Sequence, residues 1–315
     1  MNDTPSPEVM PRTGAHAQDD GERPASGGTP ARLRDLINAD GGLLLPGVAN
    51  ALTARIAEDL GFNAVYVTGA GVTNTFFGLP DIGLLSLAEM ADHVRAISDA
   101  VEVPVVVDAD TGFGNAVSVG RTVRVLEKAG ACGIQLEDQV APKRCGHFDG
   151  QEVIPLDEMR QKVRAATESR RSADTLIIAR TDARARHGLR SALDRAAAYA
   201  EAGADALFIE GLHTRDELIA AGKAVPGVPK LANMVEGGKT PLLPRAELLE
   251  MGYAVVLYAN AAMQGAIHGT QTVLAGLRDT GSLDPVLENL THWPERQRLV
   301  RRAEFDALAK RYQAG

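Results

Sequence analysis

The stretch KAGACGIQLE, residues 128–137, passes from the end of a charged helical pattern into a strand of buried type. Gly130 stands where a helix can end in the left-handed conformation that glycine adopts without strain. An apolar run follows within a few residues and stops at Glu137. The same order of features recurs in residues 59–69, 201–210 and 250–258. The chain therefore repeats a unit in which a helix ends at a glycine and a strand begins.

Four further apolar runs bring the number of expected strands to eight: residues 43–46, 105–107, 176–179 and 230–233. The runs are mostly continuous rather than alternating, as in strands that are covered on both faces. Amphipathic helical patterns lie between them, and Ser86 with Glu89 forms a capping box for one. Eight such units predict an α/β fold, a (β/α)8 TIM-type barrel over residues 31–280. The alternative is a doubly wound open sheet, which no glycine-rich dinucleotide fingerprint supports.

The two ends of the chain differ from this pattern. Residues 1–30 are rich in Pro, Gly, Ser and Asp, and we expect a disordered tail followed by a short helix over 31–39. Residues 260–277 look helical, and 281–315 form an expected C-terminal helical extension. Its charged part, 290–312, carries Trp293 and Phe305 as expected apolar anchors. An extension beyond a closed barrel needs a surface to pack on, and a second subunit is the natural candidate.

Composition narrows the class of protein. The 315 residues are 45% hydrophobic, and no apolar run is long enough to span a bilayer. A net charge of −8 argues against a nucleic-acid partner, which would need a basic face. Two cysteines cannot supply a disulfide framework, and the first residues lack the apolar segment of a signal peptide. We therefore expect a cytoplasmic protein with reduced thiols and neither a membrane nor a nucleic-acid partner.

Nearly every expected strand ends in a polar group. These groups are Thr68 to Ala70, Asp108 with Asp110, Glu137 with Asp138, Arg180, Glu210, Asn233 and Tyr258. In a barrel, the carboxyl ends of the strands meet at one rim, where active sites are built. A scaffold or a regulatory binding barrel would not need this set of side chains. The pattern therefore indicates an enzyme.

Asp108 and Asp110 end one strand two residues apart, and Glu137 ends the next. Carboxylates and water are the ligands that hard divalent cations such as Mg²⁺ prefer. The alternative is that one aspartate caps a helix that starts near Asn115. Three acids on adjacent strand ends favour the metal site, because their mutual repulsion would be costly without a cation or substrate.

The loop PKRCGH, residues 142–147, brings a thiol among cationic side chains. Cys145 is therefore a poor buried cysteine, whereas Cys132 at the start of a strand fits that role and receives no other. Three neighbours would lower the pKa of the Cys145 thiol and make proton transfer near neutrality feasible: Lys143, Arg144 and His147.

Arg180 ends an apolar run, so its guanidinium needs an anionic partner. Glu210 could serve structurally, or a substrate carboxylate could bind in a bidentate manner. His187 and His213 lie in polar sequence and are expected at the surface.

Together these motifs resemble the isocitrate lyase/phosphoenolpyruvate mutase superfamily. The resemblance covers residues 31–277, and the motifs occur in family order: GLPD at 78–81, DADTGFG at 108–114, EDQ at 137–139, KRCGH at 143–147, ARTD at 179–182 and NMVEGGKTP at 233–241. It implies an α/β barrel, usually tetrameric, with a C-terminal helix exchanged between subunits. It also implies Mg²⁺ as the cofactor, with Mn²⁺ as a substitute.

By position, the resemblance also assigns roles. It places Asp108, Asp110, Glu137 and Asp81 on or near the metal. It gives substrate contacts to Tyr66, Thr68, Gly69, Ala70, Asp108, Cys145, Gly146, Arg180, Glu210 and Asn233. Its catalytic group comprises Cys145, Lys143, His147 and Arg180.

The implied activity is that of a Mg²⁺-dependent carbon–carbon lyase. Such an enzyme cleaves a small 2-hydroxy-di- or tricarboxylate, methylisocitrate-like or dimethylmalate-like, to an α-keto acid and a carboxylate. Cys145 would supply the proton to the leaving carbon. The alternatives are an oxaloacetate hydrolase and a phosphonomutase. The chain carries Ala259-Asn260 where family members often have Pro or Ser, and its turn at 236–239 resembles the hydrolase and mutase branch.

Overall fold

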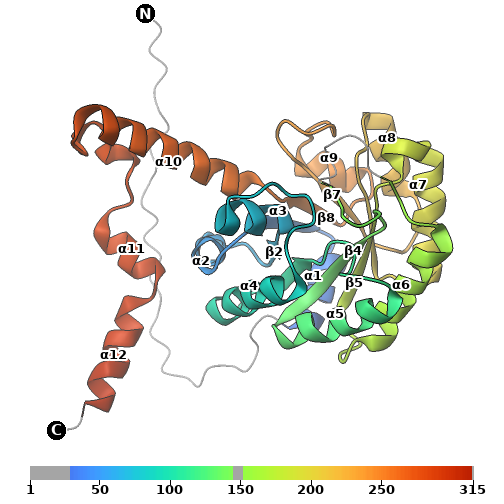
Figure 1. Cartoon of the computed structure of the whole chain (residues 1–315), viewed down its shortest axis with the longest axis horizontal. Helices are drawn as coiled ribbons and strands as arrows, with labels where there is room; N and C mark the ends of the chain where they lie inside the picture. Colours follow the sequence, from blue (N-terminus) through green and yellow to red (C-terminus); the bar gives the residue numbers. More distant parts are fainter. Residues whose placement is uncertain (1–28, 145–151, 314–315) are drawn as a thin grey trace, which may run out of the picture.

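The computed structural model describes residues 29–144 and 152–313 and contains a closed barrel of eight parallel strands in chain order (Figure 1). The barrel closes where Leu43 of the first strand pairs with Val255 of the last. The predicted (β/α)8 fold is therefore confirmed, and the open sheet is excluded. The strands are β1 (Leu43–Val48), β2 (Val65–Val67), β3 (Val105–Asp108), β4 (Ala131–Glu137), β5 (Leu176–Thr181), β6 (Ala206–Ile209), β7 (Lys230–Asn233) and β8 (Val255–Tyr258).

Helices surround the strands, as the continuous apolar runs require. Two short helical turns, α3 (Gly69–Val72) and η1 (Thr73–Phe77), separate β2 from its helix. The expected capping box is present, because Ser86 and Glu89 bond to each other's backbone N–H groups. The helices after the first seven strands are α2 (Ala51–Asp59), α4 (Leu87–Ala100), α5 (Ala116–Lys128), α6 (Leu156–Ser169), α7 (Arg184–Glu201), α8 (Arg215–Lys223) and α9 (Arg245–Glu250).

The glycine of each repeated unit has the backbone conformation that the sequence pattern predicts. Gly61, Gly130, Gly203 and Gly252 have φ values of 88°, 103°, 104° and 98°. Side chains other than glycine rarely adopt this region, so each position ends its helix and redirects the chain into the next strand.

The interior of the barrel forms its own apolar core. It contains Tyr66, Val106, Phe208 and Leu257 from the strands. The predicted first helix is α1 (Pro30–Asn38), whose Leu33 and Ile37 pack into this core. The opposite end of the barrel, where the strands finish, is left for polar side chains.

The C-terminal part begins with α10 (Ala261–Thr280), which projects away from the barrel (Figure 1) and buries none of its residues. A short η2 (Asp284–Asn289) follows, and the helix expected over 290–312 is two helices, α11 (Trp293–Leu299) and α12 (Arg302–Tyr312). They are separated at Arg301, which has a φ of 55°.

The expected apolar anchors of this extension are not buried, because Trp293 is 67% and Phe305 61% exposed. Contact with the barrel is instead ionic, with Arg298 bonding both carboxylate oxygens of Asp59 at 2.6 Å. Exposed pairs of this kind contribute little to stability. Of the predicted N-terminal tail, residues 1–28 lie outside the described residues. Within the described ranges, no helix is long and apolar enough to cross a membrane.

Candidate active site

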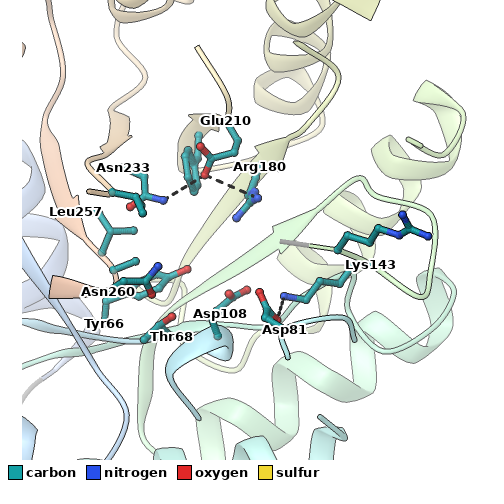
Figure 2. A pocket seen from close by; sticks show the side chains of 15 residues that line it. Tyr66, Thr68, Asp81, Asp108, Lys143, Arg180, Glu210, Asn233, Leu257 and Asn260 are labelled. Atoms are coloured by element: carbon teal, nitrogen blue, oxygen red, sulfur yellow. Dashed lines mark hydrogen bonds and ion pairs between the residues drawn. The ribbon is translucent and has the colours of Figure 1, made fainter. Parts of the chain in front are cut away.

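A small polar cavity of about 40 Å³ opens at the carboxyl ends of the strands (Figure 2). The structure places nine of the predicted site residues on its wall: Tyr66, Thr68, Ala70, Asp81, Asp108, Lys143, Arg180, Glu210 and Asn233. The remaining lining residues are Arg144, Phe208, Val235, Leu257, Ala259 and Asn260. Residues from seven of the eight strands, β2 to β8, or from the segments after them thus meet at one rim.

Three predicted residues lie behind this wall rather than on it, namely Gly69, Asp110 and Glu137. Gly69 allows the close approach of α3 to the acids. A Cβ atom at this position would lie 3.2 Å from Asp108 Oδ2 and 3.3 Å from Asp110 Oδ1. Cys145, Gly146 and His147 lie outside the described residues.

The turn after β3 directs both aspartates inward. Asp110 has a φ of 47°, and its N–H donates to Asp108 Oδ1 at 3.0 Å. Its carbonyl oxygen accepts from the N–H of Glu137, which brings the third acid beside the pair. Neither aspartate caps the next helix, because Asn115 Oδ1 accepts from Ser118 N–H and fills that role.

Lys143 is inserted among these acids. Its Nζ lies 2.5 Å from Asp81 Oδ1 and 3.0 Å from Asp110 Oδ1, and the residue is only 5% exposed. Burial alone would lower the pKa of Lys143, but the surrounding carboxylates, Asp110 foremost, hold it well above the ordinary value. The ammonium therefore stays charged and compensates part of the acidic cluster.

Arg180 is held by a partner that the sequence interpretation left without a role. Its Nε and Nη2 donate to the two oxygens of Asp182 at 2.9 and 2.8 Å. Glu210, the expected partner, is farther away, with 3.8 Å between Oε2 and Nη2. The guanidinium also lies 5.0 Å from the centre of the Phe208 ring. It is thus fixed in the wall of the cavity before any ligand binds.

Asp138 is a fully buried anchor behind Arg180. Its Oδ1 accepts from Asp182 N–H at 2.9 Å. This bond fixes the backbone of Asp182, the residue whose carboxylate holds Arg180. Its Oδ2 accepts from three groups, the side chains of Thr181, Tyr199 and Arg195. No local pattern indicates this network, because Tyr199 and Arg195 lie about sixty residues away in α7.

The cavity carries an excess of negative charge. Six carboxylates gather around Lys143 and Arg180, and Arg144 is the third cation on the wall; the acids are Asp81, Asp108, Asp110, Glu137, Asp182 and Glu210. Burial raises the pKa of Asp110 to about 7 and raises that of Glu137 well above its ordinary value. Both shifts mean that the nearby cations do not offset the free-energy cost of burying these carboxylates in their ionised form.

The donor set fits a hard divalent cation. Asp110 Oδ1 has an ion pair with Lys143 but no hydrogen bond, and Glu137 Oε1 is buried without a hydrogen-bond partner in the described residues. In residues 29–144 and 152–313, no three acidic, histidine or cysteine side chains converge closely enough to form a ready metal site. Carboxylate oxygens in an acidic cavity are the ligands that Mg²⁺ prefers, so the residues present suit this ion.

Similarity to known proteins identifies the family to which this chain belongs. The family described as phosphoenolpyruvate phosphomutase matches residues 33–278. The chain belongs to the PEP mutase/isocitrate lyase superfamily. The resemblance seen in the sequence motifs is therefore confirmed.

Two relatives illustrate the similarity. The chain is 42% identical to 2,3-dimethylmalate lyase of Eubacterium barkeri, over 91% of this chain and 99% of the relative. It is 43% identical to 2-methylisocitrate lyase of Aeropyrum pernix, over 82% of each. Both relatives carry the names of carbon–carbon lyases, and both are matched over most of their length.

Two solved structures are also similar. A crystal structure of 2,3-dimethylmalate lyase has a TM-score of 0.83 and 35% identity, covering 89% of this chain and 95% of that one. Phosphonopyruvate hydrolase in complex with oxalate and Mg²⁺ has a TM-score of 0.82 and 33% identity, covering 90% and 99%. A protein named as a lyase and one named as a hydrolase thus share the fold of this chain.

Proposed function

We propose that the protein is a Mg²⁺-dependent carbon–carbon lyase that cleaves a small 2-hydroxy-di- or tricarboxylate to a 2-oxo acid and a carboxylate. The observation that carries this proposal is the cavity, which has an acidic cluster at Asp108 and a fixed guanidinium at Arg180 (Figure 2). A cation-binding end and an anion-binding end suit a substrate with a hydroxyl-carboxylate head and a second carboxylate. The similarity to 2,3-dimethylmalate lyase over 99% of that protein supports it.

Asp108 and Asp110, with Asp81 and Glu137 beside them, are the residues that would hold Mg²⁺. When bound, the ion supplies Lewis-acid chemistry, drawing electron density from substrate oxygens and acidifying a hydroxyl. Lys143 lies between Asp81 and Asp110 and adds a positive charge at the same end of the cavity. The positive charge of Lys143 therefore lies close to the place where negative charge develops on the substrate.

Arg180 would bind the second carboxylate of the substrate. Asp182 and Asp138 hold its guanidinium in place, so no reorganisation is needed when the ligand arrives. In the reaction, the hydroxyl gives its proton to solvent, its oxygen forms the carbonyl, and the adjacent carbon–carbon bond breaks. The electron pair of that bond remains on the leaving carbon, which takes a proton from Cys145.

A substrate panel tests this proposal. We expect Mg²⁺-dependent release of a 2-oxo acid from 2,3-dimethylmalate or 2-methylisocitrate, followed by mass spectrometry of both products. Turnover of oxaloacetate alone would establish the hydrolase alternative, and rearrangement of phosphonopyruvate would establish the mutase. The same panel with excess EDTA is the control, since the proposed reaction stops without the metal.

We further propose that the protein assembles through α10, as a helix-exchanged tetramer. Exposed apolar side chains along this helix include Ile267, Leu274 and Leu277. Beside its first turn, an almost entirely apolar cavity of about 260 Å³ is lined by residues of β1 and α2, among them Val48 and Ile56. The helix α10 buries none of its residues, and an apolar cavity lies beside its first turn. Both features suit a helix that packs on a second subunit in exchange for that subunit's own helix.

Light scattering at micromolar concentration tests this assembly, and we expect a tetramer. Leu274→Glu places a charge at a position 57% exposed in the single chain, so the fold should survive while the assembly dissociates. The matched control is Val117→Glu, at an apolar position 83% exposed on α5, which should leave the assembly unchanged. A monomeric wild-type protein would show the proposal to be wrong.

A further inference from the structure

Gln139 uses both ends of its side-chain amide on the backbone of one residue, Arg144. Its Nε2 donates to the carbonyl oxygen of Arg144 at 2.8 Å, and its Oε1 accepts from the N–H of Arg144 at 2.9 Å. The two bonds reproduce the pairing that a neighbouring antiparallel strand would offer. Within residues 29–144 and 152–313, no backbone–backbone hydrogen bond involves residues 141–144. The amide of Gln139 thus takes the place of a strand in supporting this segment.

The support itself is fixed. Gln139 is 1% exposed, and its backbone forms an antiparallel bridge with Val153. The residues on either side of the bridge bond to each other, with N–H to carbonyl distances of 2.8 and 2.9 Å. The preceding residue is Asp138, whose buried carboxylate accepts four hydrogen bonds. A side chain that starts from such a backbone can hold a loop in one place.

The residue next to the supported backbone is Lys143. Its side chain is buried and reaches Asp81 and Asp110, whereas Arg144 is exposed (Figure 2). A lysine has a flexible four-carbon stem, so the place of its ammonium depends on where its backbone is held. The backbone of Lys143 is also bounded by the turn after Asp81, since a Cβ atom on Gly83 would lie 3.2 Å from Lys143 N. Contacts at the backbone and at the ammonium therefore act together.

We propose that Gln139 is a positioning residue, which holds the backbone of Arg144 and thereby places the ammonium of Lys143 in the acidic cluster. Without the amide, the backbone groups of Arg144 can bond to water, because this residue is exposed. The segment then leaves its support, and the ammonium spends less time among the carboxylates. This inference rests on the proposed function only for the use that the reaction makes of Lys143.

The test measures how accessible the Lys143 amine is in the full chain without added ligand. The protein is acetylated with a dilute amine-reactive ester, and mass spectrometry of its peptides gives the rate at each lysine. Gln139→Met keeps the length of the side chain and removes both hydrogen-bonding groups. We expect Lys143 to react about tenfold faster in this variant than in the wild type, because losing buried hydrogen bonds favours local opening. The exposed Lys223 normalises the rates.

Lys162 separates positioning from a general loosening of the barrel. It is 4% exposed, and its Nζ donates to the carbonyl oxygen of Thr111 at 3.0 Å, so it is a second buried lysine held by a loop at the same rim. In Gln139→Met its rate should stay within about twofold of the wild type, because its own contacts are kept. Gln271→Met makes the same change at an exposed position on α10 and should leave both rates unchanged.

Gln139→Asn replaces the methionine variant if that protein does not fold, since its amide is one methylene too short to reach both backbone groups. Equal rates at Lys143 in the wild type and the variant would overturn the inference, as would a parallel rise at Lys143 and Lys162. The assay needs neither metal nor turnover. A failed substrate panel with the rate difference intact would overturn the lyase alone. Cleavage in that panel with an unchanged rate at Lys143 would overturn the role of Gln139 alone.

Discussion

Replacing Asp110 with asparagine is expected to reduce turnover by at least about 10²-fold and to remove the stabilisation that Mg²⁺ gives the protein. Asp110 lies at the centre of the acidic cluster, where its carboxylate has an ion pair with Lys143 but no hydrogen bond on Oδ1. Asparagine removes the charge, keeps the shape and tolerates the left-handed backbone, with φ 47°, that this position requires. The substitution therefore tests the carboxylate and leaves the turn intact.

The metal-free variant should melt at the same temperature as the metal-free wild type or higher. Burial raises the pKa of Asp110 to about 7, so its ionised form is disfavoured in the folded protein and its loss costs nothing. In the wild type, Mg²⁺ at a hundred times its Kd should add about 2.7 kcal/mol to the free energy of unfolding, and the variant should lose most of this gain. Thermal melting with and without Mg²⁺ measures both effects.

Asp92→Asn is the matched control, because that carboxylate is 71% exposed on α4 and pairs only with Arg95 among the described residues. It should retain both turnover and the response to Mg²⁺. Full activity of the wild-type protein in excess EDTA would contradict the metal assignment outright.

The barrel could be predicted from the sequence because its signals are local. A helix that ends at glycine, followed by a continuous apolar run, needs no knowledge of distant contacts. The positive φ values at Gly61, Gly130, Gly203 and Gly252 agree with that reading. The rim of the site was also predictable, since parallel strands bring their carboxyl ends together whatever the details of packing.

The connections behind the site were not predictable in this way. Asp182 holds Arg180, and Asp138 holds Asp182, but which carboxylate meets which cation depends on side chains brought together by tertiary packing. Tyr199 and Arg195 reach Asp138 from α7, and nothing in their local sequence indicates it.

For the helical extension after the barrel, the sequence predicted helices but neither their break nor their exposed apolar side chains. A charged helical pattern over residues 290–312 gave no sign of the break at Arg301, whose positive φ no local residue preference favours. Trp293 and Phe305 were expected to be anchors because they are apolar, yet both are exposed in the single chain. Their apolar surface is consistent with contacts that a second subunit would make, which a single sequence cannot assign.

Cys145→Ser is expected to bind substrate and Mg²⁺ but to turn over at least about 10²-fold more slowly, the usual scale for losing a general acid. The prediction rests on the KRCGH motif, residues 143–147. A lyase must protonate the carbon that leaves, and a thiol beside cationic side chains is acidic enough to do so near neutrality. Serine has a similar size but is far too weak an acid. Retained stabilisation by Mg²⁺ would show that the variant still forms the metal site.

Cys132→Ala is the matched control, since it removes the other thiol, which is buried at the start of β4. It should keep its turnover. The wild-type reaction in D₂O should place one deuterium on the carbon that leaves, as mass spectrometry of the released carboxylate would detect. A mutase moves a phosphoryl-like group within one bound molecule and quenches no carbanion, so it incorporates none. Undiminished turnover by Cys145→Ser, or a product without solvent-derived hydrogen, would favour the mutase over the lyase.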